Sequence, residues 1–184
     1  MAKKPRLNLQ KWIAQGYETL TAEGPGAMRA EYLARIIGTT KGSFYWHFQD
    51  IETYREALLE DWSTKAVAAC KAATPQGAVS GDTLRDFGKT AAFWPDSDCA
   101  EAWAEPAIRG WAYYDSAAQN AIAVVDEARF SMLRGLLNRL ERGNPDFVSL
   151  YLSVAHAHIG RGTRAEEEAT RILGTLTDLL LSVE

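Results

Sequence analysis

Gly38-Thr-Thr-Lys-Gly-Ser-Phe-Tyr-Trp-His-Phe48 is the stretch of this sequence that decides its fold. Ala34 lies four residues before Gly38, and Phe44 follows six residues after it. In a helix-turn-helix, a small residue lets two helices cross closely, a glycine occupies the turn, and an apolar residue on the second helix locks it against the first. The spacing therefore predicts a short helix over about 28–37, a turn at Gly38 and a second short helix over about 40–47.

The second of these helices carries side chains suited to an outer, DNA-reading surface. Hydroxyl, ammonium, phenol, indole and imidazole groups can all donate to phosphates or to base edges. The expected outer residues are Thr39, Thr40, Lys41, Ser43, Tyr45, Trp46 and His47. The alternative is a purely structural helix pair with an aromatic face. Three consecutive residues, Tyr45 to His47, span most of a helical turn and cannot all face one core, which argues against that alternative.

Helical spacing recurs along the rest of the chain. One apolar stripe precedes the turn motif and ends at Glu23-Gly24-Pro25-Gly26. Its members are Leu9, Trp12, Ile13, Gly16, Tyr17 and Leu20. Asp50 should cap a long helix that ends before Thr74-Pro75. Further helical patterns cover about 80–93, 98–113, 117–142, 146–159 and 165–183, and Pro106 should start, kink or break its helix.

These patterns predict an all-α protein, because no stretch alternates as a strand would. We expect three regions along the chain. Residues 1–50 would form a three-helix helix-turn-helix DNA-binding domain, residues 51–73 a connecting helix, and residues 74–184 a helical domain for ligand binding and dimerisation.

The distribution of charge fits this division better than the total charge of −4 does. Residues 1–48 contain seven basic and three acidic residues, which gives +4. The whole chain has 20 basic and 24 acidic residues, so the remaining 13 basic and 21 acidic residues give −8. A basic N-terminal region can face phosphates while the acidic remainder keeps the protein soluble.

The stretch Gly38–Phe48 resembles the recognition-helix signature of the tetracycline-repressor (TetR) family. The long first helix, the short helix ending in Ala34-Arg-Ile-Ile-Gly38 and the Asp-capped fourth helix agree with that family over about residues 7–62. The resemblance implies that Thr40 and Lys41 contact phosphates or bases, and that Gly42 allows close backbone approach. It also implies that Tyr45 and His47 hold phosphates and that Trp46 packs on a sugar or a thymine methyl group.

The chain departs from the family pattern at two positions. Arg29 stands where the family often has Thr or Ser to cap the second helix, and arginine is a poor cap but a good phosphate ligand. Ile51 stands where the family often has Lys near the start of the fourth helix. A basic arm formed by Lys3, Lys4 and Arg6 would compensate for the missing phosphate contact.

Aromatic residues in the second half suggest a small-molecule pocket. Ligand sites are mostly apolar cavities with a few polar groups. We place the predicted effector site near Trp103, Trp111 and Phe130, the alternative being that these rings are ordinary core. Two apolar helical stripes close the chain, at Phe147, Leu150, Tyr151 and Val154, and at Ile172, Leu173, Leu176, Leu179, Leu180 and Val183. Paired in two subunits they would form a four-helix homodimer interface, whereas in one subunit they could simply close a core.

The sequence favours a regulator over an enzyme. It contains no G-x-S-x-G, G-x-G-x-x-G, H-E-x-x-H or G-x-x-x-x-G-K-[ST] motif, and His156 and His158 are spaced too closely to share a helix face, so no cofactor or metal is expected. The cysteines Cys70 and Cys99 fit a reducing cytoplasm. We predict a cytoplasmic, one-component transcriptional repressor that a small-molecule effector releases from its DNA operator through the helix over 51–73. The alternative is a helical ligand-binding or scaffold protein without DNA-binding activity.

Overall fold

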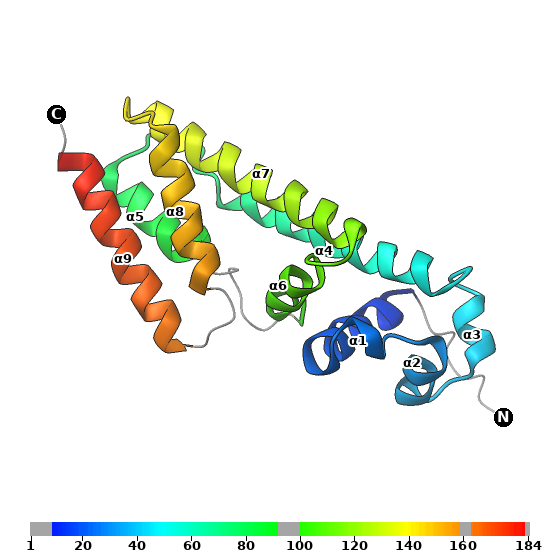
Figure 1. Ribbon diagram of the computed structural model, residues 1–184. Coiled ribbons are helices and arrows are strands. Elements are labelled where there is room, and N and C mark those ends of the chain that lie inside the picture. Colours follow the sequence, from blue (N-terminus) through cyan, green and yellow to red (C-terminus); the bar gives the residue numbers. More distant parts are fainter. Residues whose placement is uncertain (1–8, 92–99, 159–162, 183–184) are drawn as a thin grey trace. The chain divides into compact units, whose positions relative to one another are not determined.

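The computed structural model describes residues 9–91, 100–158 and 163–182 (Figure 1). Over these ranges the chain forms nine α-helices and one 3-10 turn, and no strand. This confirms the predicted all-α fold. The described residues fall into two compact units: unit 1 contains 9–63 and 100–122, and unit 2 contains 64–91, 123–158 and 163–182. Helices α4 (Ile51–Ala73) and α7 (Ser116–Arg139) each contribute residues to both units.

Unit 1 contains the helices that hold the turn motif. Besides the first parts of α4 and α7, it comprises α1 (Leu9–Glu23), the 3-10 turn η1 (Pro25–Ala27), α2 (Ala30–Ile37), α3 (Lys41–Tyr45) and α6 (Ala100–Trp111). Helix α1 packs against α2 and α6, and α2 packs against α3. The predicted stripe on α1 is buried from Trp12 to Leu20, whereas Leu9, its first residue, is exposed.

The contact between α1 and α4 leaves no room for a side chain at Gly16. A Cβ atom there would overlap the Tyr54 hydroxyl and a methyl group of Leu58. The same Tyr54 hydroxyl donates a 2.8 Å hydrogen bond to the Trp12 carbonyl, and Tyr17 donates a 2.7 Å bond to Asp61. These tyrosines hold α1 against α4. Helix α2 packs on α1 and α3 packs on α2, so the position of α3 depends on this contact.

Two predicted helix boundaries differ from the observed ones. Helix α3 ends at Tyr45, and Trp46 and His47 form a turn that brings the Phe48 N–H to 3.0 Å from the Phe44 carbonyl. Helix α6 runs continuously through Pro106, so this residue neither starts nor breaks the helix, and a kink there stays a prediction. The packing of α6 on α1, with Ala104 and Ile108 fully buried, outweighs the one backbone hydrogen bond that a proline removes.

Unit 2 is built around a core of aliphatic and aromatic side chains. It comprises α5 (Gly81–Ala91), α8 (Pro145–His158), α9 (Thr163–Ser182) and the remaining parts of α4 and α7. Helix α9 packs against both α5 and α8. The buried core residues are Leu84, Leu133, Leu136, Leu137, Phe147, Val148, Tyr151, Leu152, Ala155 and Leu173.

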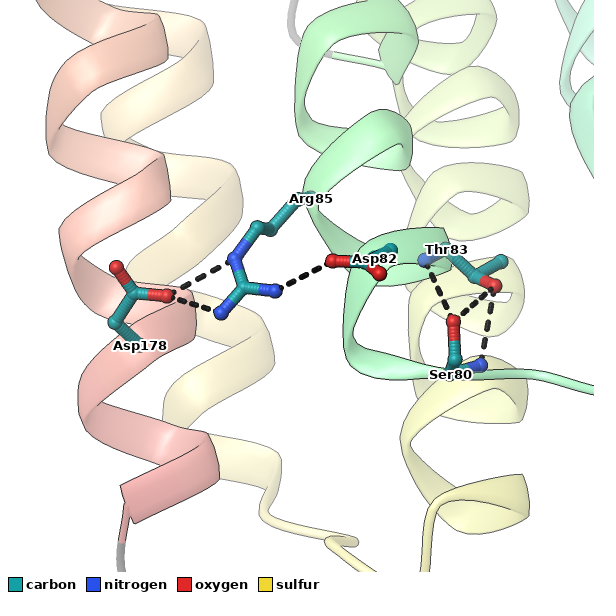
Figure 2. Close-up of polar contacts among 5 residues, drawn as sticks. All are labelled: Ser80, Asp82, Thr83, Arg85 and Asp178. Atoms are coloured by element: carbon teal, nitrogen blue, oxygen red, sulfur yellow. Dashed lines mark hydrogen bonds and ion pairs between the residues drawn. The ribbon is translucent and has the colours of Figure 1, made fainter.

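A polar cluster ties the start of α5 to α9 (Figure 2). The Arg85 guanidinium donates to Asp178 at 3.0 Å through Nε and at 2.6 Å through Nη2, and to Asp82 at 2.7 Å through Nη1. Ser80 and Thr83 cap the helix reciprocally, since each side-chain oxygen accepts the other residue's backbone N–H. The charged side chains are exposed, so the cluster fixes the register of α5 on α9 more than it stabilises the fold.

Candidate nucleic-acid interface

The turn between α2 and α3 depends on Gly38. Its backbone is left-handed, with φ 76° and ψ 36°, a conformation that costs glycine little and other residues more. The Thr39 N–H bonds the Ala34 carbonyl at 2.8 Å, and the Gly38 N–H bonds the Arg35 carbonyl at 3.2 Å. This is the pattern that closes a helix at a glycine, and it confirms the predicted end of α2.

The start of α3 is set by Thr40. Its extended backbone lets the side-chain oxygen accept the Ser43 N–H at 3.3 Å, which makes Thr40 the cap of the helix. Gly42 follows in the first turn and is exposed. A Cβ there would meet only the Thr40 hydroxyl, at 3.7 Å, an ordinary contact distance. The fold of unit 1 therefore does not require glycine at position 42.

Phe44 anchors α3 to the unit. Its ring is fully buried and meets Trp12 of α1 edge-on, with the ring centroids 5.3 Å apart. Tyr54 of α4 lies 5.4 Å away and Phe48 5.1 Å away. This aromatic cluster joins three helices and sets the rotation of α3, so the residues beside Phe44 face outward.

The outward side of α3 and the turn after it presents large, exposed side chains. Trp46 is 86% exposed and Tyr45 is 49% exposed, while Thr40, Lys41 and His47 are also exposed. Thr39 and Ser43, which were also expected on this surface, are half-buried. Exposed aromatic groups of this size on a rigidly held segment are typical of an interaction surface.

An ion pair between α2 and α3 was not predicted. The Lys41 ammonium pairs with the Glu31 carboxylate and lies 5.6 Å from the centre of the Tyr45 ring. The hydrogen bond from Lys41 lowers the pKa of Glu31, and the same bond raises the pKa of Lys41. Both groups are therefore charged at neutral pH, and an anion lies within the candidate DNA-binding surface.

The start of α2 adds positive charge to the same surface. Arg29 stands at the cap position, is exposed and makes no capping hydrogen bond, as expected from the residue type. Arg29, Glu31, Tyr32 and Arg35 line an open recess, and the Arg35 guanidinium lies 5.0 Å from the centre of the Tyr32 ring. Tyr32 and Arg35 were not singled out from the sequence, although successive steps of three residues from Arg29 to Tyr32 to Arg35 place all three on one helix face.

The start of α4 is closed by Asp50, as predicted. Its carboxylate accepts the Thr53 N–H at 2.7 Å, which lowers the pKa of Asp50 below its ordinary value. Ile51, the first residue of α4, is half-buried and offers no charge. The predicted basic arm of Lys3, Lys4 and Arg6 lies outside the described residues.

The three rings proposed for an effector site do not belong to one unit. Trp111 is buried in unit 1, and Phe130 packs against the core of unit 2. Trp103 belongs to α6, but its side chain lies outside the described ones. The effector site stays a prediction. In the described part of the chain, no group of three or more His, Cys, Asp or Glu residues could hold a metal ion, and no helix has the length and apolar character to cross a membrane.

Solved structures share this arrangement. A TetR-family transcriptional regulator from Rhodococcus sp. matches with a TM-score of 0.76 at 18% identity, over 95% of this chain and 98% of that one. A TetR regulator from Haloarcula marismortui ATCC 43049 matches with a TM-score of 0.76 at 14% identity, over 93% and 96%. SmeT, the repressor of the Stenotrophomonas maltophilia multidrug efflux pump SmeDEF, matches with a TM-score of 0.65 at 14% identity, over 96% and 90%. This chain has the TetR fold.

The similarity in structure covers nearly the whole chain, whereas the resemblance in sequence is limited to the N-terminal stretch. The sequence motifs pointed to the family over about residues 7–62, and the structures match over more than nine-tenths of the chain. Neither a protein-family model nor a curated protein matches the sequence. The three-dimensional arrangement of the helices therefore carries the similarity that the sequence beyond α4 does not.

Proposed function

We propose that this protein is a DNA-binding transcriptional regulator whose α3 enters the major groove of duplex DNA. The observation that carries the proposal is the division of one short segment into two faces. Phe44 is fully buried in the aromatic cluster, while Tyr45, Trp46 and His47 are exposed beside it. A monomeric fold gains nothing from three exposed rings on a rigid segment, whereas a groove of bases, sugars and phosphates can bind all three.

Each group on this surface has a role in the proposed complex. Lys41, Arg29 and Arg35 offer positive charge to the phosphates, and Tyr45 and His47 can donate to phosphate oxygens. Trp46 can pack against a sugar or a thymine methyl group. Gly42, which the fold itself does not require, would let the backbone of α3 approach the DNA closely.

We propose that the active form is a homodimer joined through α8 and α9. Leu179 of α9 is 59% exposed in the single chain, and Leu150 of α8 is also exposed. Covering such residues with a second copy buries apolar surface and gives a two-fold arrangement of recognition helices. A dimer of this kind would bind two half-sites about 34–36 Å apart, one turn of B-DNA.

We further propose that a small molecule bound by the helical body controls DNA binding. Helix α4 contains residues of both units, so it is a continuous covalent connection between them. An effector that prefers one of two dimer states by a few kcal/mol would change operator affinity usefully. The similarity in fold to SmeT, which is named as a repressor, supports repression as the mode of action.

Selection from a random duplex library, followed by fluorescence anisotropy, tests the DNA-binding proposal. The wild-type chain should enrich a two-fold symmetric site and bind it at roughly 10⁻⁸ M or tighter, with affinity that falls as salt rises. Lys41→Ala should weaken binding and make it less salt-dependent, while the matched variant Lys71→Ala, at the end of α4, should leave binding unchanged. If no sequence is enriched and the affinities of all three proteins are equal, the chain is a helical ligand-binding or scaffold protein instead.

A further inference from the structure

Glu31 is the single acidic residue between Arg29 and Phe48 in the sequence. It lies in the first turn of α2, and its carboxylate pairs with Lys41, the first residue of α3. Both side chains are more than half exposed, so the pair lies at the surface that the proposed function assigns to DNA. Glu31 also lines the recess that contains Arg29 and Arg35.

The carboxylate of Glu31 adds little to the stability of the fold. Exposed ion pairs contribute little or nothing to the stability of proteins in general. The rotation of α3 is already fixed by the buried Phe44 ring and by the Thr40 cap. The pair does have a definite electrostatic effect, because it cancels the charge of the one lysine on α3.

The pairing of Lys41 with Glu31 reduces the affinity for DNA that a contact between Lys41 and a phosphate can provide. A free ammonium that meets a phosphate displaces condensed counterions and gains affinity in any sequence. An ammonium held by a carboxylate must exchange that partner for the phosphate, or must bring the carboxylate's charge close to the DNA. In both cases the gain from one phosphate contact per subunit is reduced, while contacts to base edges are unaffected.

We propose that Glu31 is an intramolecular competitor of the DNA backbone, which holds Lys41 in the free protein and lowers its affinity for duplex DNA of any sequence. The inference rests on the proposed DNA-binding function. Because the competition weakens binding to random DNA, the protein would not be held at the many non-operator sites of a genome. Binding then depends more on Tyr45, Trp46 and the other groups that can touch base edges or sugars.

Salt titrations of Glu31→Gln against wild type test the proposal on two duplexes, the selected site and a scrambled one. On both, the plot of log affinity against log salt should become steeper by about 0.9 per subunit, or about 1.8 for a dimer. The advantage of the variant over wild type should therefore shrink about tenfold between 50 and 200 mM salt. Glu18→Gln is the matched control, because it removes the same charge from unit 1 and Glu18 bonds only Gln15 of its own helix among the contacts seen for it.

A double-mutant cycle separates competition from a general charge effect. In a Lys41→Gln background, Glu31→Gln should no longer steepen the salt dependence, because the cation that it releases is gone. A salt dependence that Glu31→Gln steepens no more than Glu18→Gln does, with wild type still binding the selected site, would overturn this inference alone. Failure of wild type to bind any duplex would overturn the proposed function and this inference together.

Discussion

The outer surfaces of α3 and α9 expose side chains of different chemical character in a single copy of the chain. On α3, the apolar Phe44 is fully buried, and the exposed neighbours are groups that can bind DNA. On α9, the apolar Leu173 is buried, yet the equally apolar Leu179 is 59% exposed. The first surface calls for a polar, charged partner and the second for an apolar one. The surface of α3 and the surface of α9 thus differ in the kind of partner that each can bind, and the following predictions test both.

The largest effect is expected where α3 is anchored. Phe44→Ala should lower the free energy of unfolding by about 3–5 kcal/mol, because it empties the centre of the aromatic cluster. Tyr45→Ala, one residue along, should change it by no more than about 0.5 kcal/mol. Denaturant unfolding of both variants measures this contrast. Equal losses would mean that Phe44 and Tyr45 do not occupy different faces.

The next effect should appear at α9. Leu179→Glu should weaken the proposed dimer roughly 30-fold or more, since it places an unpaired charge in an apolar interface. Val124→Glu is the matched control, because Val124 is also an exposed apolar residue of unit 2 but belongs to α7. Analytical ultracentrifugation over a concentration series gives the dimer constants. A dimer that Val124→Glu disrupts and Leu179→Glu does not would place the interface elsewhere.

A smaller effect is expected at Gly16, where α1 packs against α4. Gly16→Ala should cost about 1–3 kcal/mol in the free energy of unfolding, because its Cβ overlaps Tyr54 and Leu58. Gly26→Ala should cost almost nothing, since a Cβ there meets no atom within 4 Å. Thermal and denaturant unfolding compare the two. A tolerated alanine at position 16 would show that α1 and α4 do not pack this closely.

The smallest effect concerns the cap of α4 and depends on pH. The pKa of Asp50 is lowered by the hydrogen bond from the Thr53 backbone, so its ionised form contributes stability above its ordinary pKa of 3.8. That contribution is lost as the pH falls through the lowered value in the folded state. Asp50→Asn keeps a capping oxygen but cannot titrate, so its Tm should lie slightly below that of wild type at pH 6 and approach it near pH 3. A Tm difference that grows on acidification would contradict this sign.

The sequence predicted α3 well and the rest of the surface less well, for a physical reason. Gly38 and Asp50 act through backbone groups a few residues away, so their spacing was enough to assign their structural roles. The burial of Phe44 was predicted from its place in the turn motif, although its partner Trp12 lies on α1. Glu31 was missed because it meets Lys41 only after the turn at Gly38 folds α2 against α3. The effector site expected near Trp103, Trp111 and Phe130 stays a prediction, because composition alone does not say which rings line a pocket. Pro106 does not interrupt α6, because the packing of α6 on α1 outweighs the local rule that proline ends a helix.

The most direct test of the account compares two equally exposed aromatic residues of unit 1. Trp46, next to α3, is 86% exposed, and Tyr113, in the turn after α6, is 87% exposed. Alanine substitution of each should leave the Tm unchanged, and affinity for the selected duplex should fall about tenfold or more only for Trp46→Ala. The contrary result, in which both variants bind the duplex as wild type does, would contradict the proposal that this surface binds DNA.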